Sequence, residues 1–293
     1  MITGPPPWPG GATCAAAITF DVDAESPLHN ALGAQAPRHM SALSWFGYDR
    51  VAVPRILAAW RRRGIRQTFF VPAWCMERYA PLVEEMLADG HDVGLHGDRH
   101  ETPYELANLD EERRCVERGI EAMDRLFGAR PVGYRAPLYG LTPDTASYLA
   151  EVGIRYDSSL MGDDVPYVLE TAGGELVELP VDWANDDWPQ YVQSFEFAYH
   201  MTTRAPAAAM EVFAAELAAA RRHGGLWIAV WHPFVSGRIA RFEAVLGLVD
   251  ELLADPTVWV ATLADVERHV DGLRDSGAWA PRRDRVAVGD ADG

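Results

Sequence analysis

The chain contains no lysine, only three cysteines and no apolar run of the roughly 18 residues that cross a membrane. All 26 basic side chains are therefore arginines, which excludes a Schiff-base or lysine-nucleophile mechanism. Cys14, Cys75 and Cys115 are odd in number and widely spaced, so neither a disulfide framework nor a cysteine zinc site is predicted. Residues 1–11 lack the basic and apolar regions of a signal peptide, and we expect a cytoplasmic protein.

Acidic side chains outnumber basic ones by 43 to 26, which gives a formal net charge of −17. Nucleic acid and anionic membranes are therefore not expected as partners. The length of 293 residues and the hydrophobic content of 48% suit one α/β domain. We expect a proline-rich segment over residues 1–12, the folded domain over 13–275, and a polar, frayed tail over 276–293.

Apolar runs and amphipathic stretches alternate along the chain, and this alternation predicts a parallel sheet or barrel. Two segments have no clear period, residues 26–50 and 182–201, and we predict them to be loops that cover a site. For the first, a passive surface insertion is an equal alternative. Their aromatic side chains could stack a sugar or line a small closed pocket: Trp45, Phe46, Tyr48, Trp183, Trp188 and Tyr191. The strands are expected at 13–20, 67–71, 91–95, 133–136, 154–157, 226–231 and 258–262, and the helices at 51–63, 79–89, 109–127, 142–152, 206–222 and 239–253.

Metal-ligand side chains follow two of the predicted strands. Asp21 and Asp23 come at the end of the first strand, and His96 and His100 come at the end of the third. Two imidazoles four residues apart share one face of a helical turn and can reach one cation, with a carboxylate as third ligand. Three ligands leave coordination positions open, as a catalytic metal requires. The alternatives are a helix-capping aspartate and hydrogen-bonded core histidines.

Arg135 and His232 also follow predicted strands. An arginine at such a position can hold a carboxylate and lower its pKa, and the alternative is an ion pair between strands. A histidine after an apolar strand can act as a general acid for a leaving nitrogen, or it can be a buried residue bonded to a backbone carbonyl. Asp182, Asp186 or Asp187 could orient His232, and the sequence does not choose among them.

This order of motifs resembles the polysaccharide deacetylase superfamily (carbohydrate esterase family 4), which contains chitin, xylan and peptidoglycan deacetylases. The resemblance covers residues 8–265. It implies a distorted (β/α) barrel of about seven parallel strands in a single domain, with a divalent metal, most simply Zn²⁺. Transferred residue by residue, it implies Asp23, His96 and His100 as metal ligands, Asp21 as general base, Arg135 as its tether and His232 as general acid.

Residues 20–25 and 96–100 depart from the motifs of members that act on polymers, Thr-Phe-Asp-Asp-Gly-Pro and His-Ser/Thr-x-x-His. They are similar to the branch that includes an atypical peptidoglycan deacetylase, cyclic imide hydrolases and a metal-independent allantoinase. Because Asp23 and both histidines are retained, we expect this chain to keep its metal.

The expected function is metal-dependent hydrolysis of a non-peptide C–N bond, as an N-deacetylase-type amidase acting on a saccharide or small soluble substrate. The first alternative is a ring-opening hydrolase of cyclic amides or imides, and the second is a catalytically silent carbohydrate-binding relative. A deacetylase releases acetate, whereas ring opening yields no second product. The resemblance also permits a homo-oligomer.

Overall fold

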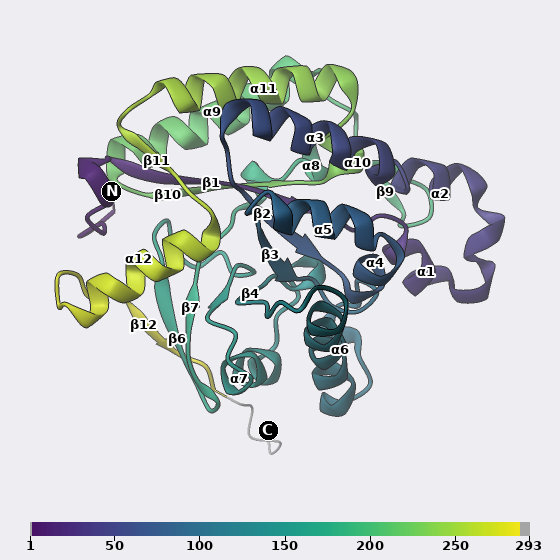
Figure 1. The fold of residues 1–293 in the computed structure, drawn as a ribbon, viewed down its shortest axis with the longest axis horizontal. Helices are drawn as coiled ribbons and strands as arrows, with labels where there is room; N and C mark the ends of the chain where they lie inside the picture. The colour runs from purple at the N-terminus through teal and green to yellow at the C-terminus, as the bar shows by residue number, and fades with distance from the viewer. Residues whose placement is uncertain (1, 288–293) are drawn as a thin grey trace.

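Seven strands joined by parallel pairing form the centre of the protein in the computed structural model, which describes residues 2–287. Their order is β10-β1-β2-β3-β4-β5-β7. This arrangement confirms the predicted α/β fold with a distorted barrel of about seven parallel strands (Figure 1). The strands are β1 (Cys14–Asp21), β2 (Thr68–Val71), β3 (Asp92–Leu95), β4 (Gly133–Tyr134), β5 (Tyr156–Asp157), β7 (Gly174–Glu178) and β10 (Leu226–Trp231).

The barrel closes where the chain beyond β7 meets β10. Asp186 forms an isolated parallel bridge with Val230, and the backbone N–H of Asp187 donates to the Val230 carbonyl at 3.0 Å. We call this bridge the seam. Three further strands belong to the same sheet. β11 (Val258–Val260) pairs with the first half of β1, β6 (Tyr167–Thr171) forms an antiparallel hairpin with β7, and β12 (Arg283–Arg285) pairs with β6.

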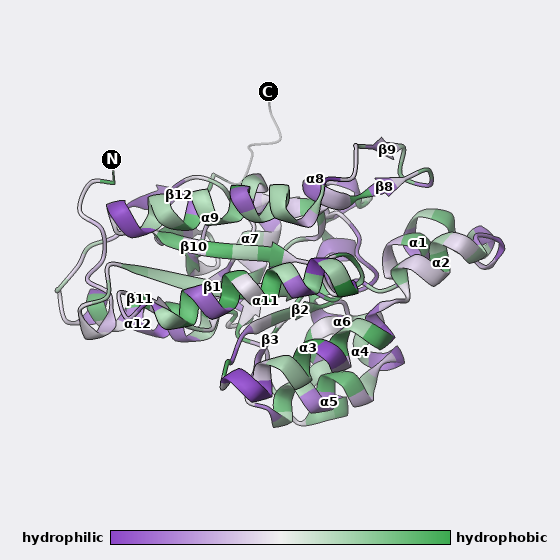
Figure 2. Ribbon diagram, turned by 90° about the horizontal axis from the view of Figure 1, so that it is seen from above, coloured by the Kyte–Doolittle hydropathy of each residue, from purple (hydrophilic) through white to green (hydrophobic). Residues whose placement is uncertain are grey.

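Helices lie outside the strands (Figures 1 and 2). The ends of several follow from local sequence. The side chain of Asn108 accepts from the Glu111 N–H to begin α6, and Gly128 ends this helix in the left-handed conformation. Within residues 2–287, no helix is long and apolar enough to cross a membrane. The main helices are α3 (Asp49–Arg63), α4 (Ala73–Arg78), α5 (Ala80–Ala88), α6 (Leu109–Phe127), α7 (Pro143–Glu151), α9 (Pro206–His223), α10 (Pro233–Ser236), α11 (Ile239–Ala254) and α12 (Leu263–Asp275).

The strands separate two hydrophobic cores, one beneath the helices and one inside the barrel. On β1, Ile18 and Phe20 belong to the core that contains residues of α3, α9 and α11, whereas Ala15 and Ala17 belong to the inner core, to which α12 also contributes. Side chains alternate between the two faces of a strand, so the inward row of β1 continues at Thr19 and Asp21. Small inward residues at the start of the strand thus lead to polar ones at its carboxyl end.

The segment over residues 26–50 is helical, so the expectation of a loop is wrong. It forms α1 (Ser26–Leu32), a 3₁₀ helix over Gly33–Arg38, and α2 (Met40–Phe46). These helices project from the body as an arm (Figure 2). They are short and interrupted by glycine and proline, so their apolar residues show no helical period. Leu28 and Phe46 are nevertheless buried and fix the arm to the core.

The second unperiodic segment contains short elements, α8 (Trp188–Tyr191) and a hairpin of β8 (Gln193–Ser194) and β9 (Tyr199–His200). At the C-terminus, the expected frayed tail is wrong for the residues of β12, which pair with β6. Residues 288–293 lie outside the described part of the chain. In the proline-rich segment, Trp8 is buried, and its indole N–H donates to the Gly224 carbonyl.

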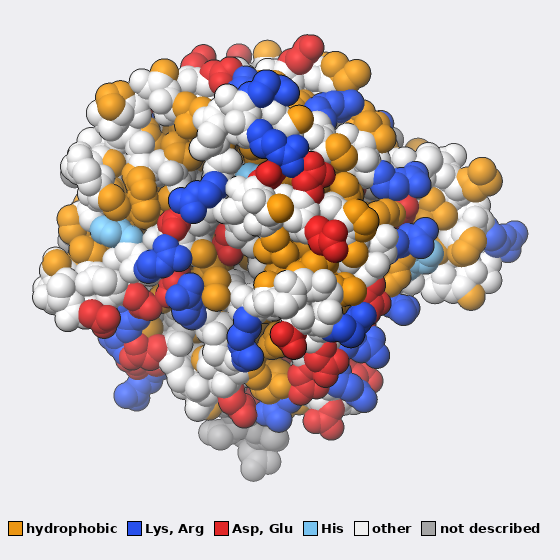
Figure 3. Space-filling view, in the orientation of Figure 1, with side chains coloured by type: hydrophobic (Ala, Val, Ile, Leu, Met, Phe, Trp, Pro, Cys, Tyr) orange, Lys and Arg blue, Asp and Glu red, His pale blue; other side chains and the backbone are white. Residues whose placement is uncertain are grey.

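Arginine and carboxylate side chains are interspersed over the face shown in Figure 3. Arg63 contacts Asp250, and Arg61 contacts both Glu85 and Asp89. Such exposed pairs contribute little to stability individually. They do show that opposite charges lie next to each other on this face.

We predict that Gly133→Ala destabilises the fold. Gly133 is an inward residue of β4, and a Cβ atom there would overlap the Tyr156 ring from the neighbouring strand. Overpacking of this kind typically costs about 1–3 kcal/mol. Chemical denaturation should therefore show a lower free energy of unfolding. The matched control is Gly272→Ala in α12, where a Cβ meets no atom within 4 Å, and a similar loss in both variants would contradict the packing argument.

Candidate active site

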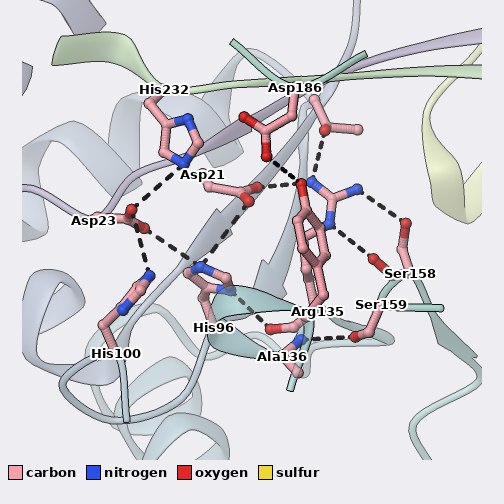
Figure 4. A network of polar contacts seen from close by, with 12 residues as sticks. Asp21, Asp23, His96, His100, Arg135, Ala136, Ser158, Ser159, Asp186 and His232 are labelled. Carbon is pink, nitrogen blue, oxygen red and sulfur yellow. Dashed lines mark hydrogen bonds and ion pairs between the residues drawn. The ribbon is translucent and has the colours of Figure 1, made fainter. Parts of the chain in front are cut away.

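The predicted site residues follow the inward rows of different strands. Asp21 ends the inward row of β1, and His96 comes two residues after the inward Gly94 of β3. Arg135 follows Gly133 of β4 in the same way, and His232 follows the inner-core residue Val230 of β10. Because the carboxyl ends of parallel strands lie at one end of a barrel, these side chains converge there (Figure 4).

Arg135 is fully buried and holds Asp21 (Figure 4). Its NH1 group donates to Asp21 Oδ1 at 2.8 Å and to Thr19 Oγ1 at 2.8 Å. The rest of the guanidinium donates to the Ser158 carbonyl and hydroxyl, each at 2.9 Å, and its carbon lies 4.2 Å from the centroid of the Phe70 ring. Although burial opposes ionisation of Asp21, the charge of Arg135 lowers the pKa of this carboxyl.

Asp23 lies at the centre of three imidazoles. Its Oδ1 is 3.4 Å from His96 Nε2, and its Oδ2 is 3.5 Å from His100 Nε2 and 3.6 Å from His232 Nε2. Burial raises the pKa of Asp23, and it lowers the pKa of His96 and brings that of His100 to about 4. Both histidines are thereby kept neutral near pH 7, which is the form that binds metal.

The chain between the two histidines is a turn rather than the helical turn expected from their spacing. Gly97 has a φ of +72° and His100 a φ of +64°, and both lie in the left-handed region. The residue after Asp23, Ala24, is also left-handed, and its N–H donates to Asp49. Left-handed conformations of non-glycine residues are costly and tend to occur at functional sites. The imidazoles converge through this turn, with ring centroids 5.1 Å apart.

The donor set of Asp23, His96 and His100 fits a divalent cation. One ligand atom from each lies within 4.8 Å of the others. Asp23 Oδ1 is buried and has no hydrogen-bond partner among the described residues, which is unfavourable unless a ligand satisfies it. His96 Nδ1 lies 2.7 Å from the Arg135 carbonyl, and this contact directs Nε2 towards Asp23.

Asp187 is the residue that orients His232. Its Oδ1 is 2.7 Å from His232 Nδ1, and its Oδ2 accepts from the His232 backbone N–H at 2.9 Å. Although burial opposes protonation, Asp187 raises the pKa of His232 well above its usual value. Asp182 is exposed and accepts from the Ala184 N–H. Asp186 faces the pocket, where it contacts Tyr139, and burial raises its pKa to about 7.

A pocket of about 660 Å³ opens in front of these groups. Both unperiodic segments contribute to its wall, as predicted for site covers, although they contain helices and a hairpin. The aromatic residues divide into two sets. Trp183 and Trp188 line the pocket, whereas Phe46 and Tyr191 are core residues with 1% and 2% exposure. Trp45 and Tyr48 are partly buried and pack against the same core. The other apolar side chains that line the pocket include Pro27, Leu138, Pro189, Phe197 and Tyr199.

The sequence analysis gave no functional role to Thr19, Ser158, Ser159 or Tyr139. Because side chains alternate along a strand, Thr19 lies on the same face as Ala15 and Ala17, and this pattern could have placed it beside Asp21. The two serines follow β5 at the same end of the barrel, and Ser159 Oγ accepts from the Ala136 N–H at 2.8 Å. The conformation of Tyr139, with a φ of +58°, leaves no signal in the sequence.

A mostly parallel barrel with paired acid–base groups and a candidate cation site at its carboxyl end describes a hydrolytic enzyme. Comparison with known proteins identifies the family. Residues 33–156 match the polysaccharide deacetylase family model. A protein of Mycobacterium smegmatis described as a polysaccharide deacetylase has 40% identity and a TM-score of 0.90, with alignment over 100% of this chain and 99% of that one. The chain belongs to the polysaccharide deacetylase family. Its relatives imply a hydrolase that acts on C–N bonds other than peptide bonds.

Two further relatives extend the comparison. The peptidoglycan deacetylase of Helicobacter pylori is 27% identical over 198 residues, which cover 59% of this chain and 67% of that protein. An allantoinase structure aligns over 96% of both chains with a TM-score of 0.81. At 22% identity, the second likeness concerns the fold alone.

Proposed function

We propose that the chain is a divalent-metal-dependent hydrolase of amide bonds, an N-deacetylase-type amidase acting on a saccharide or a small substrate. The convergence of Asp21, Asp23 and the three histidines on one pocket carries this proposal. Ligand binding alone does not require a buried general base, Asp21, and a buried general acid, His232, next to the unsatisfied Asp23 Oδ1.

Asp23, His96 and His100 would hold the cation, most simply Zn²⁺, which when bound polarises a carbonyl and lowers the pKa of water. Asp21 takes a proton from the attacking water because Arg135 keeps this carboxylate ionised. His232 starts protonated because its pKa is raised, and it delivers the proton at Nε2 to the leaving nitrogen. Asp187 fixes the imidazole ring of His232 by accepting a hydrogen bond from its Nδ1–H, so Nε2 faces the pocket.

The test is product analysis with zinc-loaded protein on N-acetylglucosamine, diacetylchitobiose, succinimide and glutarimide. We expect acetate and free amine in equal amounts from an acetamido sugar, and loss of both after treatment with a chelator. Consumption of an imide without acetate would assign the ring-opening alternative instead. If no compound reacts in the presence of Zn²⁺ or another divalent ion, the proposed function is wrong for these substrate classes.

A further inference from the structure

We propose that Asp186 and Tyr139 form a recognition pair that binds a hydroxyl or N–H group of the substrate next to the scissile amide. The pair would determine specificity and takes no part in the proton transfers. This inference rests on the proposed function, because it places the reacting nitrogen at His232.

The position of Asp186 supports this assignment. Its carboxylate lines the pocket and has an oxygen within 4.8 Å of a ring nitrogen of His232. Figure 4 shows the two side chains beside each other. A substrate group held by Asp186 therefore lies next to the nitrogen that receives the proton from His232. The neighbouring Asp187 contacts both the ring and the backbone N–H of His232, so His232 is oriented without Asp186.

The carboxylate of Asp186 has acceptor capacity left over. Oδ1 accepts from the Trp188 N–H at 2.7 Å, and Oδ2 lies 2.5 Å from the Tyr139 hydroxyl. A carboxylate has about four acceptor positions, so two contacts leave positions for a ligand. Much of the surrounding wall is apolar, including Leu138 and Trp183. A few polar groups in an apolar pocket fix the orientation of what binds there.

The backbone holds Tyr139 in place for this contact. Leu138 and Tyr139 have φ values of +52° and +58°, an unfavourable conformation for two consecutive bulky residues. The Trp183 ring packs edge-on against the Tyr139 ring at a centroid distance of 4.7 Å. The same turn exposes Leu138 and places the Tyr139 hydroxyl against Asp186 at the pocket.

A purely structural role is the competing explanation, because Asp186 Oδ1 satisfies a backbone N–H at the start of α8. Asp186→Asn separates the two roles. The amide oxygen can still accept from Trp188, whereas the second position changes from acceptor to donor. A structural role would change stability alone. A recognition role changes the discrimination between ligands.

The experiment measures dissociation constants by calorimetry for N-acetylglucosamine and for N-cyclohexylacetamide, which has the same ring size and no hydroxyls. Zinc-loaded wild type, Asp186→Asn and Tyr139→Phe are compared, and Asp182→Asn serves as the control because this exposed carboxylate caps a neighbouring turn. We expect wild type and Asp182→Asn to prefer the sugar by about tenfold, the value of a well-made hydrogen bond. In Asp186→Asn and Tyr139→Phe, the preference should fall to about twofold.

Three outcomes would overturn the proposal: an unchanged preference in Asp186→Asn, equal binding of the two probes by wild type, or no binding of either at millimolar concentration. Acetate release with an unchanged preference in Asp186→Asn would refute the recognition pair and leave the proposed function standing. A preference for the sugar that depends on Asp186, without any acetate release, would support the recognition pair and refute the proposed deacetylase function.

Discussion

Replacing Asp21 by asparagine should lower kcat/KM by about 10²- to 10⁴-fold, the contribution of a positioned general base. Asparagine keeps the shape of the side chain and an oxygen for Arg135, and it cannot take up a proton. Asp21 Oδ2 is 4.0 Å from His96 Nε2, farther than the Asp23 oxygen at 3.4 Å. The metal content of the variant should therefore equal that of wild type.

The substitution also removes the counter-charge of the buried Arg135, which should lower the free energy of unfolding by about 3–5 kcal/mol. Activity must therefore be compared well below the unfolding transition, with Asp182→Asn as the matched control. Near-wild-type activity would refute Asp21 as the base. Loss of metal from Asp21→Asn would make Asp21 a ligand rather than a base.

Replacing His96 by alanine should abolish stoichiometric metal binding and, with it, turnover. His96 is 2% exposed, and its Nε2 points at the unsatisfied oxygen of Asp23. Losing one of three ligands should weaken binding by at least about 100-fold, since even removing an outer contact to a ligand costs about 10- to 100-fold. Elemental analysis of dialysed protein measures the effect, and wild type should hold about one divalent ion per chain.

The control for this variant is His223→Ala, because His223 is an exposed histidine at the end of α9. Full metal content in His96→Ala would refute the ligand set. A wild type that stays metal-free after supplementation with divalent ions would refute the metal-dependent mechanism itself.

The parts of the fold that the sequence predicted are those with a strong local signal. β10 and α6 have the predicted bounds, because one is a continuous apolar run and the other is a long helix with a cap at each end. The helices of residues 26–46 and the β6–β7 hairpin were not predicted. They are short, and packing against distant residues decides their structure, as the burial of Phe46 against Phe234 shows.

At the candidate site, the sequence predicted which residues come together from their positions at the ends of predicted strands. Strand ends explain why Asp21, His96 and His232 are neighbours. The helical spacing expected for His96 and His100 was wrong, because the left-handed Gly97 and His100 turn the chain instead. Nothing local distinguishes Asp187 from Asp186, since the choice depends on the bridge to Val230 in a distant strand.

We expect the barrel to open locally at the seam before the whole protein unfolds. Within residues 2–287, a single backbone bridge between Asp186 and Val230 closes the barrel, whereas β1 and β10 pair over six residues. Regions with few backbone hydrogen bonds open at lower free energy than the whole molecule. At the same seam, Asp187 holds His232 and Asp186 faces the pocket. Amide protons of residues 186–188 should thus exchange with solvent before those of β1, and heat should inactivate the enzyme before it unfolds.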